Sequence, residues 1–249
     1  MAIADIFDWI QVQLDEEGKQ TAARPTVIAV DAPTIIPNEK GMRLPDRLAH
    51  RYFHRYHAGC YPANLGRPFA ARTLKFGQRL ESMGFVHQPD LDSPQSSGRY
   101  QLEVFPHAAI IHLFQLDRIL KYKKGRLAER RAELLRLRNL MRSHLPYLAP
   151  PLCLPTPSDS QSGAIGSSGL DLPNIPFGGR ALKAVEDQLD SLICAYVAAH
   201  WWYWSKEKNW VLGDRTAGYI VVPTPFGRLG MDQATQQMSR KRNRIIRRE

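Results

Sequence analysis

A short apolar run at residues 26–30 limits most strongly what this chain can fold into. It reads Thr-Val-Ile-Ala-Val, and Asp31, Ala32 and Pro33 follow it directly. Such a short run of β-branched residues favours a buried strand over a helix, and Pro33 cannot donate to a sheet ladder. We therefore expect Asp31 at the carboxyl edge of a sheet, where ligands bind in open α/β sheets. An ordinary role as a cap for the next segment explains this carboxylate equally well.

A second strand is expected at residues 99–105, where apolar side chains alternate with Gln101 and Glu103. Pro106 follows and has to end the strand. Glu103 therefore lies close to a strand end, as Asp31 does. The sequence thus places a carboxylate near the end of each of its two clearest strands.

Apolar residues at helical spacing predict helices around these strands. We expect helices at residues 2–16, 45–57, 69–84, 107–116, 126–145 and 180–204, and a turn followed by a short strand at 211–222. The expected organisation is one domain at residues 1–223, a flexible Pro-, Ser- and Gly-rich insertion at 146–179, and a basic, disordered tail at 224–249.

The chain is strongly basic, with a formal net charge of +10 over 249 residues. That charge favours a polyanionic partner, with nucleic acid ahead of an anionic membrane surface. Much of the excess lies near residues 118–142 and at the C-terminal end, and the arginines of the helix at 126–145 are expected to point mainly outward. A run of charge of this kind is also typical of an ordinary solvated surface.

The three cysteines, Cys60, Cys153 and Cys194, are far apart in the sequence and form no CxxC pair. They indicate neither a disulfide framework nor a zinc site, which fits a reducing compartment. No apolar stretch reaches transmembrane length, and the first residues do not read as a signal peptide. The sequence therefore predicts a cytoplasmic protein without a membrane partner.

Carboxylates from three separate segments are candidates for one site. Asp31 and Glu103 lie at strand ends, while Asp187 and Asp190 lie three residues apart on the last long helix and should share a face. Clustered carboxylates repel one another unless a cation lies between them, and oxygen ligands favour Mg²⁺ or Mn²⁺. Two such ions about 4 Å apart can activate water for phosphodiester hydrolysis. The alternative is that Asp187 and Asp190 simply face solvent.

A set of short motifs, each weak alone, is fairly specific in its order and spacing. The motifs are Ile-Ala-Val-Asp-Ala-Pro at 28–33, Arg43 with Asp46-Arg47, Leu-Glu-Val-Phe-Pro-His-Ala-Ala at 102–109, Tyr122-Lys123, the stretch 187–195, and Gly213-Asp214 through Gly218-Tyr219-Ile220 to Pro223. Over about residues 2–223 this set resembles the family catalogued as domain of unknown function 429. That family is regarded as predicted nucleases, and the resemblance implies an α/β, RNase H-like fold with a mixed sheet flanked by helices.

The resemblance further implies a metal-dependent nuclease that hydrolyses DNA or RNA. The implied catalytic positions are Asp31, Glu103, Asp187 and Asp190. The expected ligands of Mg²⁺ or Mn²⁺ are Asp31, Asp187 and Asp190. The residues expected to contact nucleic acid are Arg43, Arg47, Lys121 and Lys123; for Arg43, Arg47 and Lys123 a structural role is the alternative.

The chain departs from the family pattern at its start. The family begins with strands that carry a Gly-Val-Asp type segment, whose aspartate is a central metal ligand, whereas this sequence opens with a helix. We therefore expect either a misassigned start of the sequence or an N-terminally truncated domain with an incomplete metal site and an open sheet edge, which favours a homodimer. Two further hypotheses stay open: a catalytically incomplete RNase H-like module that only binds nucleic acid, and a chain with no stable fold of its own.

Overall fold

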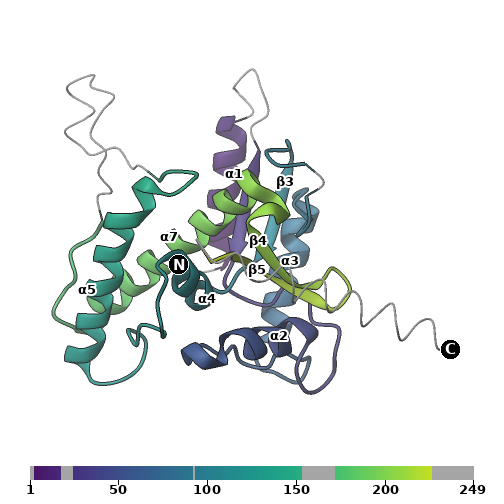
Figure 1. Ribbon diagram of the computed structural model, residues 1–249. Helices are drawn as coiled ribbons and strands as arrows, with labels where there is room; N and C mark the ends of the chain where they lie inside the picture. The colour runs from purple at the N-terminus through teal and green to yellow at the C-terminus, as the bar shows by residue number, and fades with distance from the viewer. Residues whose placement is uncertain (1–2, 18–24, 92, 153–171, 226–249) are drawn as a thin grey trace.

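The computed structural model describes residues 3–17, 25–91, 93–152 and 172–225 (Figure 1). Its helices are α1 (Ile3–Glu17), α2 (Leu44–Phe53), α3 (Ala70–Ser82), α4 (Pro106–Leu113), α5 (Leu127–His144) and α7 (Gly179–Trp204). Its strands are β1 (Thr26–Val30), β2 (Val86–His87), β3 (Arg99–Glu103), β4 (Asn209–Asp214) and β5 (Gly218–Pro223). The α/β class predicted from the sequence is confirmed at this level.

A small parallel sheet brings two of the predicted acidic residues to one edge. Its strands lie in the order β1-β3-β2, and in the pairing of β1 with β3 the residue opposite Val30 is Glu103. The N–H of Val104 donates to the carbonyl oxygen of Val30 at 3.0 Å, so the ladder continues to the last residue of β1. Asp31 and Glu103 consequently lie together at the carboxyl edge of the sheet.

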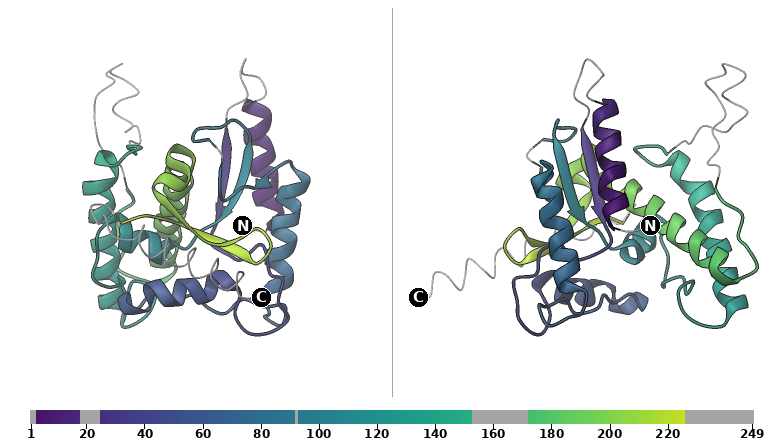
Figure 2. Two further views of the ribbon diagram at one scale, coloured as in Figure 1. Left: turned by 45° about the vertical axis from the view of Figure 1, so that its right-hand side comes forward. Right: turned by 180° about the vertical axis from the view of Figure 1, so that it is seen from behind.

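Helices cover both faces of this sheet (Figure 2). Ile28 and Val30 of β1 pack with apolar residues of α1 and α3, among them Leu80. Val27 and Ala29 pack instead against the main core, to which α7 contributes. Because side chains alternate along a strand, β1 separates these two apolar layers.

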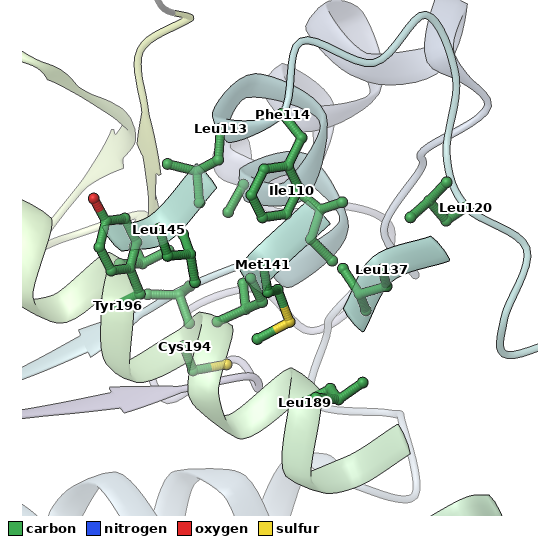
Figure 3. Close-up of a cluster of buried hydrophobic side chains, with 14 of the residues drawn as sticks. Ile110, Leu113, Phe114, Leu120, Leu137, Met141, Leu145, Leu189, Cys194 and Tyr196 are labelled. Atoms are coloured by element: carbon green, nitrogen blue, oxygen red, sulfur yellow. The ribbon is translucent and has the colours of Figure 1, made fainter. Parts of the chain in front are cut away.

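The main core lies where α4, α5 and α7 meet (Figure 3). Its labelled side chains are Ile110, Leu113, Phe114, Leu120, Leu137, Met141, Leu145, Leu189, Cys194 and Tyr196. Leu134, Leu137, Met141 and Leu145 are buried as their helical spacing predicts, whereas Leu127 at the start of α5 is exposed. Cys194 is buried here without a disulfide partner, as a small apolar residue would be.

An antiparallel hairpin, β4–β5, lies across the end of the parallel sheet and packs on α2 and α4 (Figure 1). One bridge between Val104 and Val221 joins it to the chain just after β3. The predicted turn and short strand are present at 215–217 and in β5, but the preceding strand β4 was not predicted. Glycine is common in turns, but Gly213 lies within β4. It is needed there because a Cβ would lie only 2.3 Å from the carbonyl oxygen of Gly218.

The arginines of the helix predicted at 126–145 are expected to point mainly outward; Arg126, Arg136 and Arg142 are exposed, whereas Arg130, Arg131 and Arg138 are partly buried. Arg131 Nε donates to the carbonyl oxygen of Pro176 at 3.2 Å. Arg138 donates to the carbonyl oxygens of Pro173 at 2.8 Å and Leu172 at 3.0 Å. These side chains turn inward because they satisfy carbonyl groups of the segment that leads into α7.

Both ends of the predicted flexible insertion at 146–179 lie in the described part of the chain. Leu172 and Ile175 are buried in the main core, so the second end packs against α5. Residues 153–171 and most of the predicted tail, 226–249, lie outside the described residues. Among the helices of the described ranges, none combines the length and the apolar character needed to cross a membrane.

Candidate functional site

An open cleft of about 1060 Å³ lies at the carboxyl edge of β1 and β3. Much of its lining comes from 31–33 after β1, 57–61 after α2, 103–107 around the start of α4, and the loop 119–125 before α5. Segments far apart in the sequence therefore meet at the sheet edge where α/β proteins commonly bind ligands.

Asp31 and Asp190 come together around one ammonium group at this cleft. Lys123 Nζ lies 2.7 Å from Oδ2 of Asp190 and 4.0 Å from Oδ2 of Asp31. The Asp31 side chain is 45% exposed, whereas Asp190 is buried on the inner face of α7. Tyr122 Oη donates to Oδ1 of Asp190 at 2.7 Å, so each oxygen of that carboxylate has a partner.

The environment shifts the pKa values of this group of side chains. Burial raises the pKa of Asp31 to about 6; the charge of Lys123 opposes the rise and that of Asp190 adds to it. Burial alone would lower the pKa of Lys123, but the hydrogen bond to Asp190 and the two carboxylate charges raise it overall. Burial, with the charge of Asp190, raises the pKa of Tyr122 well above its usual value. Lys123 is therefore charged at neutral pH, and Tyr122 remains a hydrogen-bond donor.

Glu103 and Arg43 form a buried ion pair in the lining of the cleft. Arg43 Nη1 donates to Oε2 of Glu103 at 2.8 Å and Nη2 donates to Oε1 at 2.6 Å, a bidentate pairing. Asp46 Oδ1 accepts from Nη2 and the carbonyl oxygen of Ile35 accepts from Nη1, each at 2.8 Å. Gly218, with φ +80°, lies so close that a Cβ there would be 3.0 Å from Nη1. This position requires glycine on both counts.

These contacts give Glu103 and Arg43 structural partners that the sequence analysis did not anticipate. Burial raises the pKa of Glu103, and the guanidinium of Arg43 opposes that rise. Both oxygens of Glu103 accept from Arg43, and all three guanidinium nitrogens donate to protein groups. Metal binding by Glu103 and phosphate binding by Arg43 stay predictions, and either would have to compete with this ion pair.

Asp187 lies apart from Asp190, although the sequence predicts a shared face. Its side chain is 61% exposed and pairs with Lys183 Nζ at 2.6 Å. The buried neighbour is Glu186, which accepts from Arg130 Nη2 at 3.2 Å and from Lys183 Nζ at 2.8 Å. Glu186 is not among the site residues predicted from the sequence. The signal that could have identified it is its spacing of four residues from Asp190, which places both on one helix face.

The remaining cationic positions are divided between the cleft and the outer surface. Lys121 and Lys124 are both exposed and both line the cleft. Lys124 is not among the site residues predicted from the sequence. Arg47 is exposed, lies outside the cleft lining, and donates from Nη1 to the carbonyl oxygen of Met42 at 2.8 Å. The loop before α5 therefore supplies most of the cleft's accessible positive charge.

The donor chemistry of Asp31 and Asp190 suits Mg²⁺ or Mn²⁺, because both supply carboxylate oxygens. Across the described ranges, however, no three His, Cys, Asp or Glu side chains group closely enough to hold a metal ion. The ammonium of Lys123 lies between the two carboxylates, where a shared cation is expected. A divalent ion bound by both residues would have to take the place of that ammonium.

A family model described as "Protein of unknown function (DUF429)" matches residues 3–216. The chain belongs to this family. The match to DUF429 covers the cleft lining apart from Ile220, and it also includes Asp190, which pairs with Lys123. No curated protein and no solved structure matches the chain. The match of the family model confirms the family assignment that the sequence motifs imply.

His107 is a further polar residue of the DUF429 cleft that the sequence analysis did not single out as a site residue. It lies in the first turn of α4, lines the cleft, and packs edge-to-face against Tyr122 with 5.4 Å between ring centroids. Its Nε2 is buried and makes no hydrogen bond to the described residues. Burial and the charge of Lys123 lower the pKa of His107 to about 3. A neutral imidazole with an unused nitrogen therefore lies against Tyr122, the residue that donates to Asp190.

Proposed function

We propose that this protein hydrolyses phosphodiester bonds of DNA or RNA in the cleft, with Mg²⁺ or Mn²⁺ held by Asp31 and Asp190. The observation that supports the proposal is the meeting of these two carboxylates, from β1 and α7, around one cation position. When bound, a divalent ion supplies charge neutralisation at the phosphate and lowers the pKa of a water nucleophile.

The residues of the chain have separate roles in this proposal. Asp31 and Asp190 bind the ion, and Tyr122 orients Asp190 through its 2.7 Å hydrogen bond. Lys123, released from the carboxylates, contacts a phosphate oxygen together with Lys121, which faces the cleft. His107 accepts a hydrogen bond at its unused Nε2 and stays neutral, because its pKa is lowered.

An RNase H-like arrangement belongs to the same proposal. It is supported by the parallel sheet, by helices on both of its faces, and by acidic residues at a strand end and on the late helix α7. The homodimer stays a prediction, and its support is that β1 pairs along only one edge within the described residues.

A nucleic-acid-binding module without cleavage is the second candidate. The observation that favours it is Lys123, whose ammonium already neutralises Asp190 at 2.7 Å. An internal cation of this kind makes a divalent ion unnecessary for the stability of the site, and the lysines of the loop still attract phosphate.

Cleavage assays with the full chain separate the two candidates. DNA and RNA strands are incubated with Mg²⁺ or Mn²⁺, or with a chelator, using Asp31→Asn, Asp190→Asn and the control Asp15→Asn on the outer side of α1. The hydrolase proposal expects metal-dependent cleavage that both site variants lose by at least about a hundredfold and the control retains. Binding without cleavage would support the second candidate, whereas cleavage unaffected by both site substitutions would exclude Asp31 and Asp190 from the mechanism.

A further inference from the structure

Tyr61 presents an aromatic ring at the mouth of the cleft. The residue is 75% exposed and lines the cleft, while Ala58 and Ala63 on either side of it are buried. The intervening carbonyl oxygen of Cys60 is hydrogen-bonded by His50 Nε2 at 2.8 Å. The loop backbone is therefore anchored on both sides of an exposed ring.

The contact between Lys124 and Tyr61 leaves the ring faces free. Lys124 Nζ lies 3.2 Å from the hydroxyl oxygen of Tyr61 but 5.5 Å from the ring centroid. Such distances place the ammonium beyond the hydroxyl end of the ring rather than over its face. A planar ligand group can therefore stack on the ring while the ammonium stays in place.

Positive charge lies beside this ring on the opposite loop. Lys121, Lys123 and Lys124 all line the same cleft as Tyr61. A single exposed aromatic residue is common on protein surfaces and needs no explanation by itself. A ring with free faces next to three lysines is the combination that sequence-tolerant binders of single strands use, with bases stacked and phosphates neutralised.

We propose that the cleft takes single-stranded nucleic acid, with one base stacked on Tyr61 and the adjoining phosphates at Lys124 and Lys121. The inference rests on the proposed function, because it puts the polynucleotide in the same cleft, and it names the substrate class. A duplex does not fit this arrangement, since the faces of its bases are covered by neighbouring base pairs. The cleft volume of about 1060 Å³ also suits a few nucleotides rather than a double helix.

The test measures binding by fluorescence anisotropy in the presence of a chelator, so that no cleavage takes place. The probes are a labelled oligothymidylate, the same backbone without bases, and a blunt duplex. The variants are Tyr61→Ala and Tyr61→Phe, with Tyr147→Ala as a matched control because Tyr147, in the short helix Leu145–Tyr147, is 78% exposed and lies outside the cleft lining.

The inference expects Tyr61→Ala to weaken oligothymidylate binding about tenfold and to leave binding of the base-free strand unchanged. Tyr61→Phe keeps the ring and should bind within about twofold of the parent chain, as should Tyr147→Ala. The inference would be overturned if Tyr61→Ala weakened binding of both single strands equally. It would also be overturned if Tyr61→Ala and Tyr147→Ala bound oligothymidylate equally well, or if the parent chain bound the duplex more tightly than oligothymidylate. Metal-dependent cleavage lost in Asp31→Asn, together with unchanged binding in Tyr61→Ala, would overturn this inference alone and leave the hydrolase proposal standing.

Discussion

The ammonium of Lys123 lies 2.7 Å from a carboxylate oxygen of Asp190, on the inner face of α7. The same ammonium is 4.0 Å from Asp31 at the end of β1. A lysine on a loop thus joins a strand end to a distant helix, at the position that the hydrolase proposal assigns to a divalent cation.

Lys123→Met should increase the affinity for Mn²⁺, because the internal cation no longer competes for Asp31 and Asp190. We expect an increase of about tenfold, equivalent to about 1.4 kcal/mol, measured by isothermal titration calorimetry. Lys121→Met is the matched control, since it removes the same charge from the cleft without breaking an ion pair to Asp190. An equal change in Mn²⁺ affinity in both variants would mean that only the overall positive charge of the cleft affects metal binding.

Asp31 should make stability fall as the pH rises. Its pKa is raised from 3.8 to about 6 by burial, so the folded chain binds this proton more tightly than the unfolded chain. The contribution to stability is complete below about pH 4 and is lost as the pH rises through about 6. Asp31→Asn cannot titrate and should show a flatter dependence in urea unfolding between these values. The difference should be small, because water screens a side chain that is 45% exposed, and parallel curves for the two proteins would contradict the assignment.

The same pKa predicts the pH dependence of metal binding. Mn²⁺ binds the deprotonated carboxylate, so its affinity should increase as the pH rises from about 5 to about 7. Titrations at both pH values measure this, and Asp31→Asn should show weak binding that no longer increases over that range. Binding that weakens with rising pH would exclude Asp31 as a ligand.

Arg43→Lys should destabilise the fold strongly, even though the charge is kept. The guanidinium pairs bidentately with Glu103 and also holds Asp46, a geometry that an ammonium cannot reproduce. We expect a loss of about 3 kcal/mol in the free energy of unfolding, measured by chemical denaturation. Arg47→Lys, four residues along on an exposed surface, should change it by less than about 0.5 kcal/mol. A small effect at Arg43 would show that the buried ion pair is dispensable.

Substitution by asparagine should have a large effect on Mn²⁺ binding and cleavage at Asp190 and a small one at Asp187. Asp190→Asn removes a buried charge that pairs with Lys123, and it should abolish both Mn²⁺ binding and any metal-dependent cleavage. Asp187→Asn affects an exposed side chain paired with Lys183 and should leave both nearly unchanged. Similar losses in the two variants would support the shared site that the sequence alone predicts.

The strands β1 and β3 were predictable because their signals are local. A β-branched run before Pro33 and an alternating run before Pro106 each specify a strand and its end. The presence of Asp31 and Glu103 near one sheet edge follows from the parallel order of those strands. By contrast, β4 was not predictable, since Gly213 signals a turn unless its close approach to Gly218 is known.

The contents of the candidate site depended on contacts that local patterns do not encode. Tyr122-Lys123 reads as part of a basic turn, and nothing nearby in the sequence indicates that it reaches Asp190 on α7. Which acidic side chains of α7 point inward depends on the rotation of the helix about its axis. Glu186 is buried and its neighbour Asp187 is not, and the sequence pattern did not distinguish these adjacent positions. Arg43 reads as a surface cation until its partner on β3 is known.

Arg43 also ties the assembly of the cleft to the folding of several segments at once. Its guanidinium contacts the chain after β1 at Ile35, helix α2 at Asp46 and strand β3 at Glu103, and Gly218 of the hairpin lies against it. Neither α2 nor β3 can leave without depriving the buried guanidinium of a counter-ion, and loss of the segment at Ile35 would remove a hydrogen-bond acceptor. We infer that they open and close as one cooperative unit, so their slowest amide protons should exchange at a common rate, and no partly unfolded form retains a working cleft.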